Sequence, residues 1–460
     1  MSEDSIKPFD AIIIGSGQAG NPLASALADE GWKVAIIEAA HPGGSCINFG
    51  CTPTKTMIAS ARAAHVARNA NKVGVHVGNV SPNLQKIVAR KDDIVESFRV
   101  STKQNLVNND NISLIEGKAF FKNKNSVEVA LNNGGRLSCT AEKIFINTGT
   151  IPNIPALKGL DEVPHHTSTT LLDVTEIPEH LVVLGGGYIG LELGQMYSRF
   201  GSEVTIIESG DQLMAKEDDD VAEEMKDILE GEEINVLLNL SVKSVSRLSS
   251  GKVKVHFDNN AVRDITCTHL LLATGRKPNT AELRLKNAGV QTGEHGEIVV
   301  NERLQTNVEG IYAVGDVKGG PMFTHISYDD FRVVRDNLLK NGSHTTNDRM
   351  LPYTVFTDPQ LGRIGLSERQ AREQGKNFEV KKLMMENSSR GVETNHTRGF
   401  LKSLVEKDTG KILGFAALSH EGGEIASMVQ IAMMGGLKAE QLRDAIFSHP
   451  LYAESLNKVF

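Results

Sequence analysis

The chain has 460 residues, more than one ordinary hydrophobic core holds, and a prior of ~150 residues per domain suggests about three domains. Its composition, 40% hydrophobic and 23% charged, is that of a soluble globular protein. The net charge of −8 argues against a nucleic-acid or anionic-membrane partner, and no apolar run reaches the ~18 residues of a membrane span.

The N-terminal residues 1–10 lack the basic and apolar regions of a signal peptide. Four cysteines in so long a chain are not a disulfide scaffold. We therefore expect a cytoplasmic location, where a close cysteine pair is more often catalytic, redox-active or metal-binding than a structural bridge.

The first motif along the chain is a glycine-rich loop between an apolar strand, residues 9–14, and a helix-like stretch, residues 21–30. Its three glycines permit a tight turn, close approach of a pyrophosphate and close helix–strand packing. They are Gly15, Gly17 and Gly20. A second strand ends in Glu38, which is placed to accept a hydrogen bond from a ribose hydroxyl. This unit predicts a dinucleotide site.

A cysteine pair, Cys46 and Cys51, follows directly in a glycine-rich stretch. A helix is expected to begin near Cys51 and to run past Lys55, and a helix N-terminus lowers a thiol pKa. Inert buried cysteines and half of a zinc site are the alternatives, but zinc usually takes four ligands, so we predict a redox-active pair and no metal. Cys139 and Cys267 stand in apolar, strand-like contexts and are interpreted as core thiols.

The glycine pattern recurs after a second apolar strand, residues 181–184. Its glycines are Gly185, Gly187 and Gly190. A helix-like stretch and a strand follow, and the strand again ends in an acid, Glu208. Two complete units imply two dinucleotides, one tightly held and one exchanging. A carboxylate at Glu208 pairs with a free 2′-hydroxyl and repels a 2′-phosphate, so NADH is favoured and NADPH remains possible.

The C-terminal part changes to a strand-rich pattern after Pro352. Residues 400–406 and 412–418 predict a hairpin, and helix-like stretches follow at residues 424–434 and 439–447. Upstream, the acidic run at residues 217–220 opens a helix-like stretch and is expected to form a solvated face favoured by the helix dipole.

Near the end of the chain, His449 stands just before an expected helix start, and Glu454 lies in its first turn. Glu454 is placed to reach one imidazole nitrogen and to leave the other as a base. The alternative interpretation is that His449 is an ordinary surface residue, as a single histidine near a chain end usually is.

Taken together, the two glycine units and the stretch from Gly43 to Lys55 resemble the pyridine nucleotide-disulfide oxidoreductases, such as dihydrolipoyl dehydrogenase, glutathione reductase and mercuric reductase. The resemblance covers nearly the whole chain. It implies an α/β fold with two Rossmann-like dinucleotide-binding domains and a C-terminal α+β dimerisation domain. The implied ranges are 1–150 with 276–346 for FAD, 151–275 for the nicotinamide dinucleotide, and 347–460 for dimerisation.

The same resemblance assigns roles to single residues. Cys46 is implied as the interchange thiol and Cys51 as the charge-transfer thiol against the flavin. Lys55 is implied to pair with Glu192 near the flavin, and Tyr188 matches a residue that in some members covers the flavin until nicotinamide arrives. Further cofactor contacts are implied at Gly44, Ser45, Thr148, Gly149, Gly275, Asp316 and His325.

Family enzymes end in a His-Pro-x-x-x-Glu motif that this sequence keeps. The resemblance implies a homodimer in which His449 exchanges a proton with Cys46 of the other subunit while Glu454 orients it. Leu451 stands where better-known members usually have Thr, and this ending more closely resembles the reactive-chlorine-resistance flavoproteins. No cysteine follows Cys267, so the C-terminal pair of mercuric reductase is not expected.

The predicted function is that of an FAD-dependent oxidoreductase passing electrons between a nicotinamide, FAD and the Cys46–Cys51 disulfide to an unidentified small-molecule disulfide or other oxidised acceptor. Three alternatives remain: a dihydrolipoyl dehydrogenase, a metal-ion or oxidant reductase, and a non-catalytic flavin-binding partner protein. The sequence leaves open the acceptor, the nicotinamide and the direction of electron flow.

Overall fold

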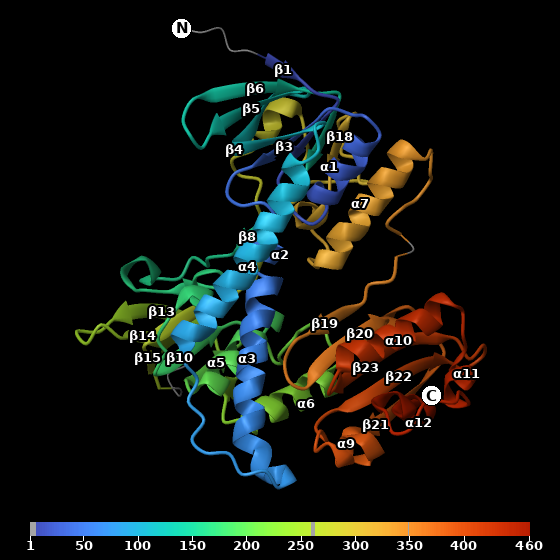
Figure 1. The fold of residues 1–460 in the computed structure, drawn as a ribbon. Coiled ribbons are helices and arrows are strands. Elements are labelled where there is room, and N and C mark those ends of the chain that lie inside the picture. Colours follow the sequence, from blue (N-terminus) through green and yellow to red (C-terminus); the bar gives the residue numbers. More distant parts are fainter. Residues whose placement is uncertain (1–5, 259–262, 348) are drawn as a thin grey trace. The chain divides into compact units, whose positions relative to one another are not determined.

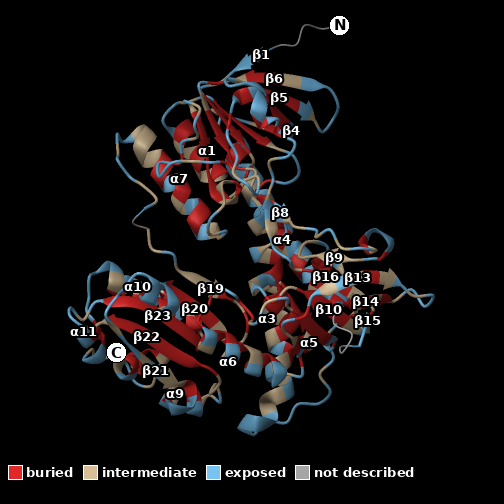
Figure 2. Ribbon diagram, turned by 180° about the vertical axis from the view of Figure 1, so that it is seen from behind, coloured by how far each residue is buried: buried red, intermediate tan, exposed pale blue. Residues whose placement is uncertain are grey.

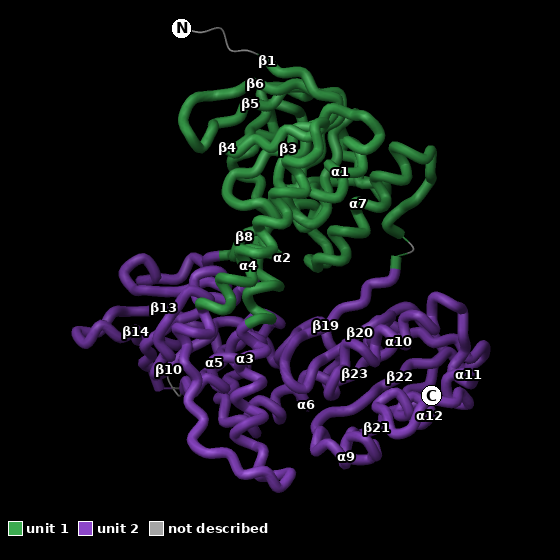
Figure 3. The backbone as a smooth tube through the Cα atoms, in the orientation of Figure 1, with its two compact units in different colours: residues 1–56, 89–153, 276–349 green, residues 57–88, 154–275, 350–460 purple. Residues whose placement is uncertain are grey.

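The computed structural model describes residues 6–258, 263–347 and 349–460. The chain divides into two compact units, coloured green and purple in Figure 3. Unit 1 comprises residues 1–56, 89–153 and 276–349, and unit 2 comprises residues 57–88, 154–275 and 350–460. The finer division into three domains stays a prediction.

The sheet of unit 1 has eight strands, in the order β1 (Ile6–Pro8), β6 (Arg136–Thr140), β5 (Ser126–Leu131), β4 (Ile112–Asn123), β3 (Val34–Glu38), β2 (Ala11–Ile14), β7 (Lys143–Ile146) and β18 (Ile311–Ala313) (Figure 1). The run from β4 to β18 is parallel, whereas β5 pairs antiparallel with both neighbours. A separate antiparallel pair joins β8 (Thr150–Pro152) to β17 (Arg276–Pro278). The parallel run confirms the dinucleotide-binding arrangement expected from the first glycine motif.

Helices cover this sheet. All four residues of β2 are buried, as expected for a parallel strand covered on both faces. Figure 2 shows the strands beside α1 in the red of buried residues. Leu23 of α1 (Gly20–Asp29) and Phe331 of α7 (Thr324–Leu339) belong to one hydrophobic cluster with Ile13 of β2. The short α2 (Gly44–Asn48) precedes α3 (Cys51–Asn69), which begins in unit 1, and α4 (Leu84–Val107) ends there.

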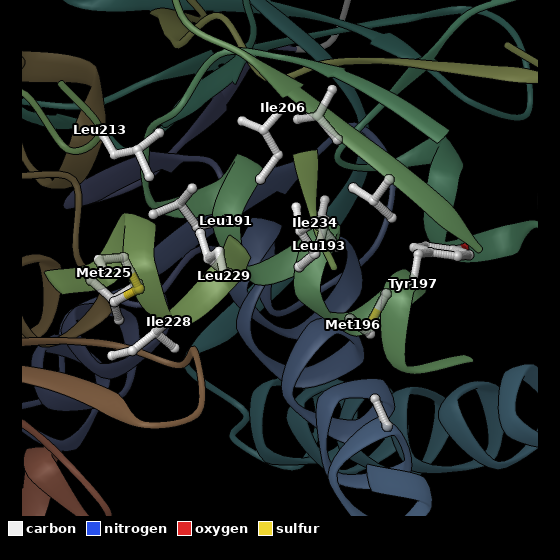
Figure 4. Close-up of a cluster of buried hydrophobic side chains, with 14 of the residues drawn as sticks. Leu191, Leu193, Met196, Tyr197, Ile206, Leu213, Met225, Ile228, Leu229 and Ile234 are labelled. Atoms are coloured by element: carbon white, nitrogen blue, oxygen red, sulfur yellow. The ribbon is translucent and has the colours of Figure 1, made fainter. Parts of the chain in front are cut away.

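Unit 2 contains a second parallel sheet, in the order β12 (Asn235–Leu237), β11 (Glu203–Ile207), β10 (His180–Leu184), β16 (His269–Leu272) and β9 (His166–Thr167). Its helices are α5 (Tyr188–Phe200) and α6 (Asp219–Glu230). Leu191 of α5, Met225 of α6 and Ile206 of β11 lie in one buried cluster (Figure 4). A small antiparallel sheet of β13 (Val242–Arg247), β14 (Val253–Phe257) and β15 (Ile265–Cys267) is also part of unit 2.

The C-terminal part of unit 2 is an antiparallel sheet, in the order β19 (Tyr353–Val355), β20 (Gln360–Gly365), β23 (Ile412–Ser419), β22 (Phe400–Glu406) and β21 (Phe378–Met384). Its helices are α8 (Glu368–Glu373), α9 (Ser389–Glu393), α10 (Gly422–Met434), α11 (Ala439–Arg443) and α12 (Ser455–Val459). The predicted hairpin is confirmed by β22 and β23. The helix expected at residues 439–447 ends earlier, at Arg443.

The acidic run differs from expectation. Glu217 is fully buried and Asp218 is 6% exposed, so the prediction of a solvated face is wrong for both. The cause is the C-terminal sheet, whose buried Lys402 lies 3.1 Å from Asp218 and 2.9 Å from Asp220. None of the helices in the described ranges is both long and apolar enough to cross a bilayer.

Candidate active site

The first glycine loop, in unit 1, is packed so tightly that only glycine fits. Gly15 has a φ of +103°, and a Cβ there would stand 2.3 Å from the carbonyl oxygen of Asn147. A Cβ on Gly20 would stand 2.5 Å from the carbonyl oxygen of Gly15. The Gly20 amide donates to Asn147 Oδ1 at 2.9 Å, and Asn147 Nδ2 donates to the Val314 carbonyl at 3.0 Å. Asn147 thus ties the loop to the segment after β18.

Glu38 is held at the carboxyl end of β3 by its own loop. Its Oε2 accepts from the Ser16 amide at 2.9 Å and its Oε1 from the Ala40 amide at 2.9 Å. The carboxylate is therefore fixed beside the glycine loop, where the ribose of a dinucleotide lies in this class of fold.

The cysteine stretch is fastened to the same loop. The Gly43 amide donates to the Ser16 carbonyl at 2.8 Å, and a Cβ on Gly44 would stand 2.8 Å from Gly17 Cα. Ser45, the next residue, is exposed at the start of α2. The stretch that carries the two cysteines therefore packs directly against the first glycine loop.

Cys46 lies in α2, and Cys51 is the first residue of α3, as the sequence predicted for that helix start. Both cysteines are in the thiol form, without a disulfide between them in the described structure. A hydrogen bond with Cys51, together with burial and the charge of Cys51, raises the pKa of the Cys46 thiol. The two thiols therefore titrate as an interacting pair, and a negative charge on Cys51 opposes ionisation of Cys46.

Cys51 has polar neighbours that favour a thiolate. Its Sγ lies 3.3 Å from Thr324 Oγ1, at the first position of α7. The negative charge of Cys51 also acts on the Arg276 guanidinium, whose pKa is lowered by burial and raised by Asp316 and Cys51. Arg276 donates to Thr150 through Nε, at 2.8 Å to Oγ1, and through Nη2, at 2.7 Å to the carbonyl oxygen.

Asp316 lies in a short 3-10 turn, Gly315–Lys318, after β18. Burial raises the pKa of its carboxyl, while Arg276 and Lys318 oppose the shift. Thr150 Oγ1 is 3.4 Å from Asp316 Oδ2. Two residues before Thr150, Thr148 Oγ1 is buried without a hydrogen-bond partner in the described part of the chain, and Gly149 adopts a φ of +64°.

His325 is the second residue of α7, and its ring stacks on Phe323 with centroids 5.5 Å apart. Lys55 lies in the second turn of α3 within unit 1, while its predicted partner Glu192 belongs to unit 2. Glu192 is buried and accepts from the Phe356 amide at 2.8 Å. The Lys55–Glu192 pairing stays a prediction.

The second glycine loop, in unit 2, repeats the geometry of the first. A Cβ on Gly185 would stand 2.5 Å from the Ala273 carbonyl oxygen, and one on Gly190 would stand 2.2 Å from the Gly185 carbonyl oxygen. A Cβ on Gly187, in contrast, meets no described atom within 4 Å, and the same holds for Gly275, whose φ is +98°.

Glu208 mirrors Glu38. Its Oε2 accepts from the Gly186 amide at 2.7 Å and its Oε1 from the Gly210 amide at 2.8 Å. Tyr188, the first residue of α5, donates its hydroxyl to Glu217 Oε1 at 2.7 Å.

At the end of unit 2, His449 Nδ1 lies 3.0 Å from Glu454 Oε1, and the Leu451 amide donates to Glu454 Oε2 at 2.9 Å. The hydrogen bond from His449 and that from the Leu451 backbone lower the pKa of Glu454. The His449 side chain is 72% exposed. One imidazole nitrogen is therefore held by a carboxylate on an exposed surface.

Sequence reasoning missed the residues that connect these pieces. Asn147, Thr324 and Arg276 belong to none of the motifs singled out in the sequence, and Glu217 was expected only as part of a solvated acidic face. A signal for Asn147 was its position beside Thr148, directly after a buried strand. The other contacts join residues far apart in the sequence.

Comparisons with known proteins all lead to the same family. The pyridine nucleotide-disulphide oxidoreductase family matches residues 9–330, and its dimerisation domain matches residues 351–460. The chain belongs to the pyridine nucleotide-disulfide oxidoreductase family. It is 40% identical to the probable pyridine nucleotide-disulfide oxidoreductase RclA of Escherichia coli K12 over 98% of both chains. It is 34% identical to a mercuric reductase of Lysinibacillus sphaericus over 99% of this chain and 82% of that one.

Solved structures agree. The Cu(II) complex of the HOCl-induced flavoprotein disulfide reductase RclA from Escherichia coli matches with a TM-score of 0.91 and 39% identity, over 98% of this chain and 99% of that one. A second structure of that reductase matches with a TM-score of 0.89 and 40% identity, over the same shares. These findings confirm the predicted family, fold class and enzyme class. The reading as a non-catalytic flavin-binding protein is not supported.

The family uses FAD and a nicotinamide nucleotide, and the residues of unit 1 fit FAD. The loop bearing Gly15, Gly17 and Gly20 lies at the N-terminus of α1, where a pyrophosphate binds in this class of fold. The Thr148 oxygen, which has no hydrogen-bond partner among the described residues, and the half-buried Asp316 offer further polar contacts. Residues 351–460 are a dimerisation domain, which supports a homodimer.

Proposed function

We propose that this enzyme uses NADH to reduce an oxidised small-molecule acceptor through a redox-active disulfide between Cys46 and Cys51. Two observations support this proposal. Cys51 raises the pKa of Cys46, so the two thiols interact, and the stretch that carries them is hydrogen-bonded to the first glycine loop through Gly43 and Ser16. When bound, FAD supplies two-electron exchange between the nicotinamide and the disulfide.

The chain's own residues then carry the thiol chemistry. With a disulfide acceptor, the Cys46 thiolate attacks one acceptor sulfur, forms a mixed disulfide and releases the first acceptor thiol. Cys51 attacks the Cys46 sulfur, restores the Cys46–Cys51 disulfide and releases the second thiol. Two electrons and two protons leave the enzyme in each cycle, which matches the reduction of one acceptor disulfide to two thiols.

Proton transfer in this cycle is assigned to the partner subunit's His449. Glu454 holds the imidazole at 3.0 Å and fixes its orientation. His449 is exposed and lies within residues 351–460, the matched dimerisation domain, and this supports a position facing the second subunit. The imidazole accepts the proton of Cys46 before attack and returns it to the leaving thiol.

The predicted preference for NADH rests on Glu208. Its carboxylate, held by Gly186 and Gly210, stays at the end of β11 with its negative charge toward the ribose position. A 2′-phosphate placed there meets electrostatic repulsion, whereas a 2′-hydroxyl donates a hydrogen bond.

A second candidate acceptor is Cu(II), because a solved relative is a Cu(II) complex of RclA. Two Cu(II) ions oxidise the two thiols to the disulfide and leave as two Cu(I) ions, with release of two protons. Thiolates are soft ligands that suit Cu(I), so the same cysteine pair serves this reaction.

An acceptor panel tests the proposal. Holoenzyme with NADH or NADPH is mixed with small disulfides, lipoamide, glutathione disulfide, Hg²⁺, Cu²⁺ and quinones. The proposal expects turnover with NADH that is lost in Cys46→Ser and kept in the control Cys267→Ala, which removes a buried thiol in β15. Turnover of dihydrolipoamide with NAD⁺ as the best reaction would instead establish dihydrolipoyl dehydrogenase.

A further inference from the structure

The fully buried Glu217 is unusual because two tyrosine hydroxyls converge on one of its oxygens. Tyr188 donates to Oε1 at 2.7 Å and Tyr353 donates to the same atom at 2.5 Å. The two rings stack with centroids 5.6 Å apart. A buried carboxylate needs such partners, since desolvation strongly penalises an unpaired charge.

The second oxygen of Glu217 faces a buried cation. Arg363 Nε lies 3.1 Å from Glu217 Oε2, and Arg363 is 3% exposed. The pKa of Arg363 is raised overall. Burial by itself lowers this pKa, but the interactions of Arg363 with Glu217 and Tyr353 raise it by more. Burial and the charge of Glu217 raise the pKa of Tyr353 to about 12 and also raise that of Tyr188, so both hydroxyls keep their protons as donors.

This cluster is joined to the second glycine loop through the backbone. The Met214 amide donates to the Gly186 carbonyl at 2.9 Å, and the Glu217 amide donates to the Met214 carbonyl at 2.7 Å. Tyr188 is the residue directly after Gly187 and begins α5. A dinucleotide bound at that helix N-terminus lies against Tyr188, because the pyrophosphate rests on the first amides of the helix.

The Tyr188 side chain is held at two points. Its hydroxyl donates to Glu217 and its ring stacks on Tyr353. Without the hydroxyl bond, the ring has other staggered rotamers available at the N-terminus of α5.

We propose that Glu217 and Tyr353 are positioning residues for the nicotinamide nucleotide: they hold Tyr188, the residue directly after the second glycine loop, in the position that the bound nucleotide meets. The inference rests on the proposed function, in which unit 2 binds the nicotinamide. Because affinity falls with the fraction of binding-competent protein, loss of the tether weakens nucleotide binding without touching the thiols.

Phenylalanine substitutions test this with little risk to the fold, because each removes one oxygen and keeps the ring. Tyr197→Phe is the matched control, since Tyr197 lies on the same helix and donates to the Leu171 carbonyl at 2.6 Å, away from the loop. NAD⁺ binding to each holoenzyme is measured by calorimetry, with NADP⁺ in parallel, and the NADH dependence of flavin reduction is followed by rapid mixing.

Tyr188→Phe is expected to raise the Kd for NAD⁺ about three- to tenfold, the range that one buried hydrogen bond supports. In Tyr353→Phe the limiting rate of flavin reduction should stay within about twofold, which separates an effect on binding from an effect on the reaction. Tyr353→Phe is expected to act in the same direction by a smaller factor, and Tyr197→Phe to leave the Kd unchanged. An unchanged or lower Kd in Tyr188→Phe, or an equal rise of the Kd in Tyr197→Phe, would overturn this inference but leave the proposed function standing. If neither nicotinamide reduces the wild-type flavin, the proposed function fails and the inference fails with it.

Discussion

The two glycine loops, residues 15–20 and 185–190, are built alike, down to the carboxylates of Glu38 and Glu208 that accept from a loop amide. They differ in what the chain places beside each loop. The first is fastened to the cysteine stretch and tied by Asn147 to the segment bearing Asp316. The second is followed by a backbone segment that ends in the buried Glu217.

We propose that this difference lets one motif serve two purposes. Beside the first loop, the thiol pair works with a dinucleotide that stays bound. Beside the second, a Cβ on Gly187 meets no described atom beyond its chain neighbours and the tethered Tyr188 begins α5, which suits a dinucleotide that exchanges. Variants that act on one loop and not on the other therefore test this account.

The largest effect is expected at the thiols. Cys46→Ser should reduce acceptor turnover by about 10³-fold or more, because the remaining thiol cannot complete the exchange. NADH should still reduce the flavin, since the second loop is untouched. The oxidised variant should also show a long-wavelength absorption band from the lone Cys51 thiolate beside FAD. Absence of that band would contradict the assigned roles of the two cysteines.

The next effect concerns the proton. His449→Ala should slow acceptor turnover by about 10²- to 10⁴-fold while flavin reduction by NADH stays within about twofold. Glu454→Gln keeps an oxygen near Nδ1 and should cost less. Rapid-mixing measurement of the two half-reactions separates them, and equal slowing of both would remove the acid–base role.

A matched pair of glycine substitutions compares the loops directly. Gly17→Ala places a Cβ 2.8 Å from Asn147 Oδ1 and should lower thermal stability and FAD content. Gly187→Ala meets no described atom, so FAD content and melting temperature should stay near wild type while NADH affinity falls about tenfold as the methyl group meets the pyrophosphate. If Gly187→Ala lost FAD instead, the assignment of the two loops would be wrong.

The carboxylates provide a second matched pair. Glu208→Gln removes the repulsion of a 2′-phosphate and should lower the preference for NADH over NADPH about tenfold. Glu38→Gln should leave that preference unchanged. The preference is measured from initial rates with NADH and with NADPH. If it changed only in Glu38→Gln, the nicotinamide nucleotide would have to be assigned to the first glycine loop instead of the second.

The smallest effect is a pH dependence confined to unit 2. Burial, with nearby Arg199, lowers the pKa of His65 to about 4, and burial with His396 lowers that of His420 to about 4. The unfolded chain binds these protons from about pH 6.5 downward, so stability contributed by the neutral rings is lost as the pH falls from about 6.5 to 4. His420→Gln, which cannot gain a charge, should lose less stability between pH 7 and pH 5 in urea unfolding. An identical loss would exclude His420 as a contributor.

Much of this molecule was predictable because its signals are local. The spacing of Gly15, Gly17 and Gly20, the strand ending in Glu38 and the start of α3 at Cys51 depend on neighbouring residues. The contact between His449 and Glu454 spans five positions and was likewise expected.

The failures involve long-range packing. The acidic run has the composition of an exposed helix start, and only the distant Arg363 and Lys402 explain why it is buried. Thr324 meets Cys51 across 273 positions, and Asn147 bonds Gly20 across 127, so no sequence window contains either pair.

The central claim, that Cys46 and Cys51 form a disulfide in electronic contact with FAD, is tested most directly by an anaerobic reductive titration of the holoenzyme. The account predicts that wild type takes up four electrons per FAD, two for the flavin and two for the disulfide, and that Cys46→Ser takes up only two. Uptake of two electrons by both proteins would contradict it.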